Sequence, residues 1–323
     1  MISICIPVYN TDVRELAEAL HGQAERLDGD TEILLLDDRS DDTVRETNRA
    51  IRNLPRVRYK ELPANTGRSR IRNRLASLAE QDFLLFLDCD MQITNPDFLR
   101  HYADLIPSQE VVCGGHTYPP EPPAPEFILH WKAGCRRESV PASVRNRRPH
   151  HAFMTSNFLI RKEIFSRLTF SEYLNGYGHE DTLFGYQLKL LNIPVFHTDN
   201  PARHKGLEPA DVFLEKTRQA IRNLLHIEQM IRHDDGFTHM IRVLRTRKTL
   251  RRLHLGGVYR HMFSCFRKGL ENHLLGERPG LRMLDLYKLG VLLTDERGME
   301  APAGTERSEP DQAVKGNGKR SRT

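Results

Sequence analysis

Two aspartates, Asp88 and Asp90, directly follow the uninterrupted apolar run of residues 83–87. Such a run is typical of a strand buried on both faces of a parallel sheet. In open α/β sheets ligands bind beyond the carboxyl ends of the strands, and residues two apart in an extended chain point the same way. This carboxylate pair could therefore hold a hard divalent cation, Mg²⁺ or Mn²⁺, together with water and substrate phosphates. The alternative is an Asp-rich turn, because D-x-D is short and common.

Two further groups of acids stand at comparable positions. Asp37 and Asp38 follow the apolar segment 32–36, so two predicted strands end in acids at the same edge of the sheet. Glu180 and Asp181 follow the glycine-rich stretch 176–178 and begin a predicted helix. Acids in this place often do no more than complement the helix dipole. The repetition at two strand ends favours a real site.

Strand and helix signals alternate through most of the chain. Strands are predicted at 2–8, 32–36, 57–62, 83–87, 111–115, 153–160 and 195–196. Helices are predicted at 16–27, 68–79, 95–106, 162–168 and 180–191, and a further helix begins at 40–42. This β-α-β-α order predicts an α/β fold with a parallel, doubly wound sheet. The basic, proline-containing stretch 136–151 has no clear period, and we expect it to be mobile or to contact substrate.

From about Val212 the pattern is helical, with long helices predicted at 213–231 and 237–275. The second is rich in Lys and Arg interleaved with apolar residues, which suits an interfacial helix on an anionic membrane. The alternative is a helical appendage packed on the catalytic domain with a solvated basic face. Residues 296–323 have almost no apolar side chains, and we expect a disordered tail.

Composition limits the function class. The chain has 323 residues, a formal net charge of +5 and five scattered cysteines without a C-x-x-C motif, which predicts reduced thiols. Neither a signal peptide nor a membrane-spanning stretch is evident, so we expect a cytoplasmic protein. A nicotinamide dehydrogenase would need G-x-G-x-x-G after the first strand, where Pro7-Val8-Tyr9-Asn10 stands. A nucleotidyltransferase would need a basic, glycine-rich loop there. Few aromatics accompany the basic region, which argues against nucleic acid.

The motifs occur in a specific order. They are Ile6-Pro7-Val8-Tyr9-Asn10, Asp37-Asp38-Arg39-Ser40-Asp41-Asp42, Asn65-Thr66-Gly67-Arg68-Ser69-Arg70-Ile71-Arg72-Asn73, Asp88-Cys89-Asp90, Gly178-His179-Glu180-Asp181 and His204. This order resembles the family 2 glycosyltransferases, which are inverting nucleotide-sugar enzymes with a GT-A fold. Arg39 and Ile71 depart from the commoner Gly and Ala. The resemblance covers roughly residues 1–220. We therefore expect a catalytic domain over 1–220, a basic α-helical region over 221–295 and the tail over 296–323.

The resemblance also implies roles for single residues. It assigns the nucleotide sugar to Pro7, Tyr9, Asp38, Gly67, Arg68, Arg72 and Asp88. Of these, Asp38 would accept a hydrogen bond from the uracil N3–H and Asp88 would bind a ribose hydroxyl. The DXD aspartate Asp90 and His204 would bind Mn²⁺ or Mg²⁺, although His204 could be a plain surface residue. Asp38 could alternatively cap the following helix.

The resemblance identifies Asp181 as the general base, and we expect the helix N-terminus to keep it ionised. Glu180 is expected to bind a donor or acceptor hydroxyl, and the two acids could exchange roles. Trp131 and Asn157 are candidates for contact with the sugar or the acceptor, although Trp131 could be a core residue.

The implied function is a metal-dependent inverting hexosyltransferase. It would move a sugar from a nucleotide sugar, most simply a UDP-sugar, to a glycan or lipid-linked acceptor in polysaccharide or glycolipid synthesis, with peripheral contact to the inner membrane face. The alternative is a binding-only protein of the same fold, whose basic C-terminal region contacts a membrane or nucleic acid.

Overall fold

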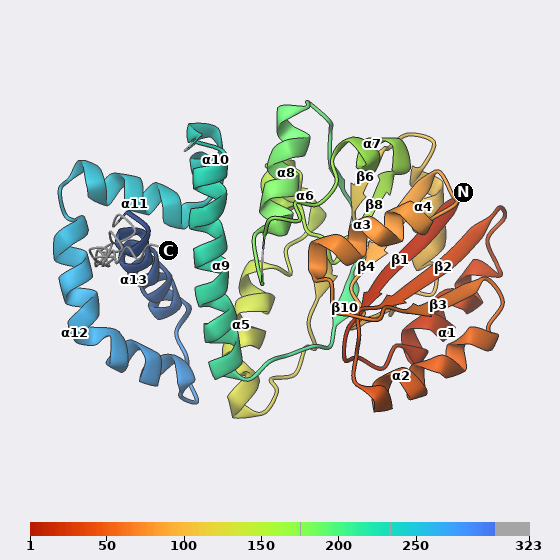
Figure 1. Ribbon diagram of the computed structural model, residues 1–323, viewed down its shortest axis with the longest axis horizontal. Coiled ribbons are helices and arrows are strands. Elements are labelled where there is room, and N and C mark those ends of the chain that lie inside the picture. Colours follow the sequence, from red (N-terminus) through yellow and green to blue (C-terminus); the bar gives the residue numbers. More distant parts are fainter. Residues whose placement is uncertain (175, 233, 301–323) are drawn as a thin grey trace, which may run out of the picture.

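The computed structural model describes residues 1–174, 176–232 and 234–300 (Figure 1). Within them, a seven-stranded sheet has the order β3-β2-β1-β4-β8-β6-β9. Its strands are β1 (Ile2–Val8), β2 (Thr31–Asp37), β3 (Val57–Glu61), β4 (Phe83–Leu87), β6 (Val111–Cys113), β8 (Asn157–Arg161) and β9 (Phe196–His197). β1 pairs in parallel with β2 and β4, β2 with β3, and β6 with β9. Only β8 is antiparallel to its neighbours in this sheet. The mostly parallel α/β prediction is therefore confirmed.

Both faces of the sheet are buried, and this explains the unbroken apolar run in β4. Leu85 and Leu87 pack in one core cluster with α1 (Arg14–Ala24) and α4 (Phe98–Leu105). Leu84 and Phe86 face the opposite cluster, to which α3 (Arg68–Leu78), α7 (Lys162–Arg167) and α8 (Glu180–Leu190) contribute. Successive strand residues point to opposite faces, so a strand with two covered faces has no place for polar residues.

Shorter helices connect these elements. They are α2 (Asp42–Asn48), α5 (Ile128–Arg137), α6 (Ala142–Arg145) and the 3₁₀ helices η1 (Arg49–Asn53), η2 (Pro125–Phe127) and η3 (Pro149–Ala152). The stretch 136–151, expected to be mobile or to contact substrate, packs on the sheet through Arg145. This side chain is 4% exposed, and its guanidinium donates to the carbonyls of Cys113, Gly114 and Thr198. The Arg145 contacts therefore anchor this stretch to the sheet.

A second, three-stranded sheet has the order β5-β10-β7, formed by β5 (Met91–Gln92), β10 (Ala202–His204) and β7 (His116–Thr117). The pairing of β10 with β5 is antiparallel and sets His204 opposite Met91. His204 was predicted in a loop, and the structure places it at the end of this short strand. The pairing brings His204 beside the DXD segment because Met91 directly follows Asp90.

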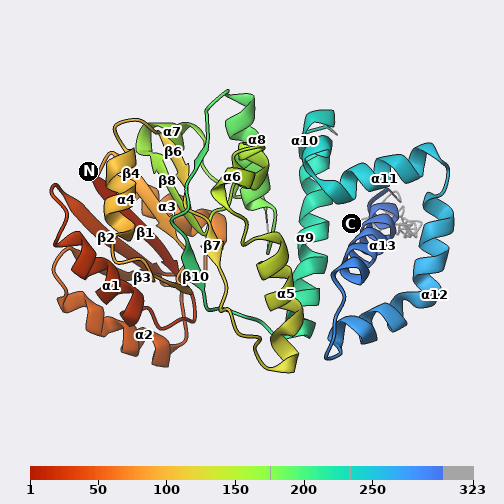
Figure 2. The ribbon, with the colours of Figure 1, turned by 180° about the vertical axis from the view of Figure 1, so that it is seen from behind.

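The C-terminal region comprises α9 (Ala210–Met230), α10 (Asp235–Met240), α11 (Arg242–Arg252), α12 (Gly256–Leu275) and α13 (Leu281–Glu300). Figures 1 and 2 show α9 between the sheet-containing part and the frame of α11, α12 and α13. The single helix predicted over 237–275 is wrong, because Ile241 is extended and His254 has a φ of 56°, which interrupts regular helix. None of the helices in the described ranges combines the length and apolarity needed to cross a bilayer.

The C-terminal helices share one core with the preceding part. That core holds Leu129 of α5 and Leu183 of α8 together with Leu224, Phe263 and Tyr287 of the C-terminal helices. The domain boundary predicted after residue 220 falls inside α9. Residues 296–300, assigned to the tail, belong to α13, and the remainder of that predicted tail lies outside the described residues.

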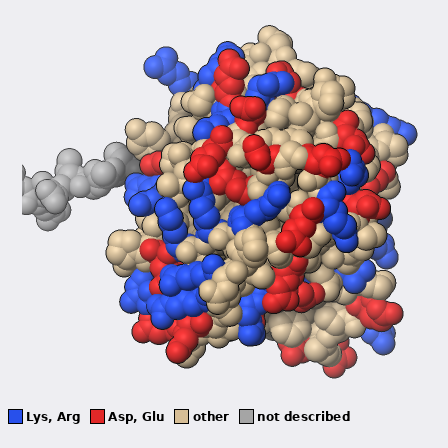
Figure 3. Space-filling model, turned by 90° about the vertical axis from the view of Figure 1, so that its right-hand side faces the viewer, with Lys and Arg blue, Asp and Glu red and all other residues tan. Residues whose placement is uncertain are grey.

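Figure 3, which faces the side on the right of Figure 1, shows acidic and basic side chains interspersed there.

A buried ion-pair group ties three of these helices together. Arg247 of α11 lies 2.5 Å from Glu228 of α9 and 2.9 Å from Glu296 of α13. The side chains of Arg247 and Glu228 are 7% and 1% exposed. Arg247, one of the arginines in the basic region, is thus buried in ion pairs between helices, which supports the packed-appendage interpretation for α11.

Candidate active site

A cleft with two lobes lies beyond the carboxyl ends of β1, β2 and β4. The sheet lobe, of about 910 Å³, is lined among others by Pro7, Tyr9, Asp38, Gly67 and Arg72. The helix lobe, of about 780 Å³, is lined among others by Glu138, Glu180, Asp181 and Lys288. The lobes share Arg68, Asp88, Asp90, Tyr177, Gly206, Glu208 and Lys216. A ligand in one lobe can therefore meet a ligand in the other at the DXD segment.

Asp38 fixes the loop that precedes α3. The side chain is 4% exposed, and its Oδ1 accepts hydrogen bonds from the Thr66 N–H at 2.7 Å and the Thr66 hydroxyl at 2.8 Å. Its Oδ2 accepts from the Gly67 N–H at 2.9 Å. Gly67 has a φ of 86°, a conformation that favours glycine, and it directly precedes α3 as its N-cap. A carboxylate has about four acceptor positions, so Asp38 keeps one for a ligand donor.

Two arginines of α3 reach the cleft in different ways. Arg72 is 2% exposed and donates from Nη2 to Asp88 Oδ1 at 2.6 Å, so it holds this aspartate in place. Arg68 lines both lobes, and its guanidinium lies 4.7 Å from the ring centre of Tyr177. Its Nη1 is 3.8 Å from Glu180 Oε1. Arg68 is thus the member of the pair that a phosphate in the cleft can reach.

Asp90 and His204 form a pair that fits a divalent metal. Asp90 Oδ2 lies 3.2 Å from His204 Nε2, while Asp90 Oδ1 and His204 Nδ1 are buried and have no hydrogen-bond partner. A Cβ at Gly206 would collide with Asp90 Oδ2, so a side chain there would fill this space. Among the described residues no group of three His, Cys, Asp or Glu side chains forms a complete metal site. Mg²⁺ and Mn²⁺ are commonly held by few protein ligands plus water and phosphate oxygens, which matches this partial set.

The acid pair stands at the start of α8 on the helix lobe. His179 precedes it with a φ of 68°, and Gly178 has a φ of 104°. A Cβ at Gly178 would come within 2.5 Å of the Ala220 Cβ on α9, so glycine permits the close approach. Glu180 Oε2 accepts from the Gly178 N–H at 3.1 Å, and Asp181 Oδ1 accepts from the Thr182 N–H at 2.6 Å.

The environment of Asp181 corrects one expectation. Burial, and then the neighbouring charge of Glu180, raise the pKa of Asp181 to about 7. The helix N-terminus was expected to keep this carboxyl ionised, but desolvation outweighs that effect. A carboxyl with this pKa is a stronger base than an ordinary aspartate and is still substantially ionised near neutrality.

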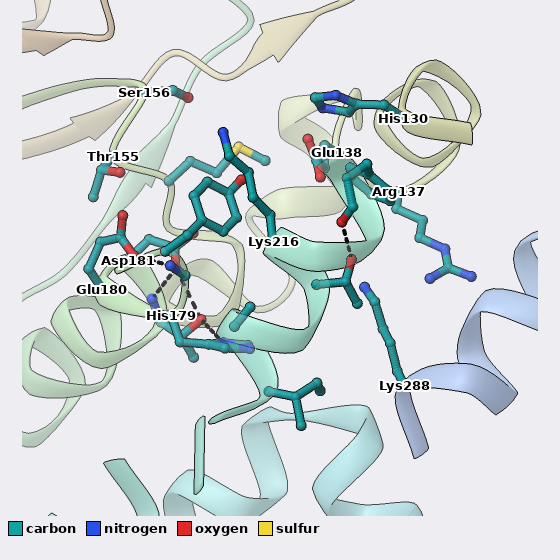
Figure 4. Close-up of a pocket in the computed structure, with 18 of the residues that line it drawn as sticks. His130, Arg137, Glu138, Thr155, Ser156, His179, Glu180, Asp181, Lys216 and Lys288 are labelled. Carbon is teal, nitrogen blue, oxygen red and sulfur yellow. Dashed lines mark hydrogen bonds between the residues drawn. The ribbon is translucent and has the colours of Figure 1, made fainter. Parts of the chain in front are cut away.

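Sequence reasoning missed a set of residues on the far wall of the helix lobe. Glu138 Oε2 accepts from the Tyr118 hydroxyl at 2.6 Å and lies 3.2 Å from His116 Nε2, whose Nδ1 is 2.9 Å from Ser156 Oγ. The ring of His130 lies 5.8 Å from that of His204. Figure 4 shows Glu138 and His130 across the lobe from Glu180 and Asp181. Glu138 and His130 come from segments without a recognisable motif. The basic composition of residues 136–151, which include Glu138, was the only sequence signal.

Two of the predicted site residues lie away from the cleft. Asn157 is fully buried in β8, where its amide donates to the carbonyls of Gly115 and Asn200 and accepts from the Tyr102 hydroxyl. Its polar atoms are therefore occupied within the core. Trp131 lines neither lobe, and its indole N–H donates to the Pro119 carbonyl at 2.8 Å. The other predicted residues, including Pro7 and the exposed Tyr9, line the cleft together.

Comparisons with known protein sequences give one family match. The family model described as "Glycosyl transferase family 2" matches residues 3–169, a range that includes Asp38, Asp88 and Asp90 and ends before the acid pair. A search of curated proteins found no match.

Several solved structures share the fold. A mannosyltransferase from Pyrobaculum calidifontis, in complex with GDP-Man and Mn²⁺, has a TM-score of 0.60 at 12% identity, over 93% of this chain and 87% of that chain. Residues 1–349 of S. aureus TarS give 0.50 at 20% identity, over 92% and 91%. Glucosyl-3-phosphoglycerate synthase from Mycobacterium tuberculosis, with Mg²⁺ and UDP, gives 0.50 at 19%, over 70% and 78%. These likenesses show the predicted GT-A fold. The chain spans 39% of the length of a longer TarS chain that it also matches.

Proposed function

Because the chain belongs to glycosyl transferase family 2, we propose that it is a metal-dependent nucleotide-sugar glycosyltransferase that inverts the anomeric configuration of the transferred sugar. Its donor is a UDP-sugar, and its acceptor is a hydroxyl of a glycan or lipid-linked molecule. The observation that carries the proposal is that a candidate metal-binding pair and a candidate general base line the same cleft. Asp90 lies where the lobes join, beside His204, and each of these two side chains has one buried atom without a hydrogen-bond partner. Asp181 lies in the helix lobe.

The sheet lobe suits the nucleotide. Asp38 has one acceptor position left for a base N–H, and Tyr9, 53% exposed, offers a ring for the base to contact. Asp88, which accepts a hydrogen bond from Arg72, would bind a ribose hydroxyl. The diphosphate then lies near the shared wall, where the Arg68 guanidinium can neutralise part of its charge.

Asp90 and His204 would hold Mn²⁺ or Mg²⁺, which when bound supplies positive charge to the departing diphosphate. In the helix lobe, Asp181 takes the proton of the acceptor hydroxyl as that oxygen attacks the anomeric carbon. The bond from this carbon to the diphosphate oxygen breaks, and the nucleoside diphosphate leaves with the electron pair. A single displacement of this kind inverts the anomeric configuration, so an α-linked donor yields a β-linked product.

Release of nucleoside diphosphate from a panel of UDP- and GDP-sugars, with and without Mn²⁺ or Mg²⁺, tests the reaction class. We expect turnover of one donor that depends on metal and is lost in Asp90→Ala. Asp181→Asn should retain nucleotide affinity and lose transfer by about 10²–10⁴-fold, as expected for a general base. Asp104→Asn, an exposed aspartate of α4, is the matched control. No metal-assisted turnover or binding of any nucleotide sugar would refute the proposal and leave a binding-only protein.

We also propose peripheral contact with an anionic membrane, which would suit a lipid-linked acceptor in polysaccharide or glycolipid synthesis. Val258, Met262 and Phe266 are 56%, 54% and 65% exposed and lie at helical spacing along α12. Exposed Arg267 and Lys268 flank this stripe. An apolar stripe bordered by cations matches an interfacial helix.

Co-sedimentation with phosphatidylglycerol vesicles tests the membrane contact. The triple variant Val258→Ser/Met262→Ser/Phe266→Ser should lose binding that the wild type shows at low salt. Leu190→Ser removes a comparably exposed leucine from α8 and should bind as the wild type does. If the triple variant sedimented as fully as the wild type, α12 would not be the contact.

A further inference from the structure

The helix lobe has several cations on its wall, and all but one of them are paired within the described residues. Arg137 of α5 contacts Asp285 at 2.8 Å, and Arg242 lies 3.8 Å from the same aspartate. Lys216 of α9 pairs with Glu208. Lys288 of α13 also lines the lobe, yet its amine has neither a hydrogen bond nor an ion pair with any described residue. The unpaired charge is therefore at a defined place on this wall.

Lys288 is held there by the packing of its helix. Arg137 donates from Nη2 to the Leu281 carbonyl at 2.8 Å, and its contact with Asp285 ties the same turns of α13 to α5. Tyr287, next in the chain, is fully buried. Figure 4 shows the Lys288 side chain extending from α13 into the lobe, across from Glu180 and Asp181. The part of α13 that carries Lys288 is therefore held at the wall of the lobe.

The nearby acids already have partners of their own. Asp285 serves Arg137 and Arg242, and Glu138 is engaged by Tyr118 and His116. Burial, and then the charge of Arg137, lower the pKa of Lys288 although Glu138 and Asp285 act in the opposite direction, so these two acids compensate the cation only in part. A cation in a partly desolvated cavity gains most from an anionic ligand that supplies the missing partner.

We propose that Lys288 binds an anionic group, a phosphate or a carboxylate, carried by the acceptor. This inference rests on the proposed function, because it takes the helix lobe as the acceptor side. Repulsion from Glu180 and Asp181 keeps the anion away from their end of the lobe and directs it to Lys288. The acceptor is thereby oriented with its hydroxyl toward Asp181 and its charge toward α13.

The first experiment measures binding without catalysis. Lysines of the full-length protein are reductively methylated with ¹³C-formaldehyde, and inorganic phosphate is titrated while the methyl signals are followed by NMR. The Lys288 signal is identified by its absence in Lys288→Gln. We expect it to shift with saturation at phosphate concentrations that leave the signal of Lys268, exposed on α12, in place. If the Lys288 signal moved only in parallel with that of Lys268, the anion site would be refuted.

The second experiment compares acceptors by nucleotide release. Glucose, glucose 6-phosphate and glucuronic acid are supplied as probes with the donor found in the hydrolysis panel. We expect kcat/KM to be at least about tenfold higher for one anionic probe than for glucose, and which probe it is distinguishes phosphate from carboxylate. Lys288→Gln should remove this preference through a rise in KM of about ten- to a hundredfold, as expected for one lost charge-assisted hydrogen bond. Lys288→Arg should retain the preference.

Donor hydrolysis without acceptor separates the two proposals. It reports on the donor side alone, and it should be unchanged in the control Lys60→Gln, which replaces an exposed lysine of β3 that lines neither lobe. A wild type that hydrolyses donor but shows no anion preference, or a preference that survives Lys288→Gln, overturns the role of Lys288 and leaves the glycosyltransferase assignment standing. Phosphate binding at Lys288 without any donor turnover overturns the enzymatic proposal and retains the anion site.

Discussion

The pKa of Asp181 makes a specific prediction about how transfer depends on pH. Burial and Glu180 raise this pKa from 3.8 to about 7. If Asp181 must be ionised to accept the proton, only about 10% of the enzyme is active at pH 6 and about 1% at pH 5. With an ordinary pKa of 3.8, about nine tenths would be active at pH 5. The two cases differ by roughly two orders of magnitude at that pH, which a rate measurement resolves easily.

The assay is the initial rate of nucleoside diphosphate release with acceptor, from pH 5 to pH 9 at fixed metal concentration. The acidic limb of kcat/KM for the acceptor should have its midpoint near pH 7. Glu180→Gln removes the second cause of the shift, so the midpoint should move to lower pH while burial keeps it above 3.8. Glu172→Gln, which removes a carboxylate from the sheet lobe, should leave the midpoint in place.

Two results would refute this reasoning. One is a wild-type rate that stays flat between pH 5 and pH 8. The other is a midpoint that rises in Glu180→Gln, because removing a negative neighbour can only make ionisation of Asp181 easier. Nucleotide affinity measured over the same pH range shows whether the acidic limb belongs to transfer or to donor binding.

Three further predictions concern stability and donor binding. Because the pKa of Asp181 is raised on folding, the folded state holds the extra proton and the free energy of unfolding falls as pH rises from 3.8 to about 7. Urea unfolding should show a fall of about 3 kcal/mol between pH 5 and pH 8, and Asp181→Asn should abolish it. Glu228→Ala leaves the buried Arg247 with only Glu296 and should cost about 3 kcal/mol of unfolding free energy, whereas a loss below about 1 kcal/mol would contradict the role of the pair. Asp38→Asn turns an amide toward backbone N–H donors and should weaken UDP binding about ten- to a hundredfold by calorimetry, and unchanged affinity would refute its role.

Much of the fold was predictable because its signals are local. β1, β2 and β4 lie where apolar runs predicted them, since strands covered on both faces require such runs. The acids at the ends of β2 and β4 follow from the same pattern, because parallel strands end at one edge of the sheet. Helix breaks in the C-terminal region were missed, since the sequence there keeps an apolar period across Ile241 and His254.

The chemistry of the site divides in the same way. The sequence by itself determined which residues carry oxygen and nitrogen ligands and that Asp38, Asp88 and Asp90 gather at the sheet edge. Only the tertiary structure decided that His204 pairs with Asp90, that Asp181 titrates near neutrality and that Lys288 reaches the same cleft. Each of these depends on contacts between segments distant in the chain. Strand pairing, burial and the approach of α13 arise from long-range packing, which the local pattern of residues does not contain.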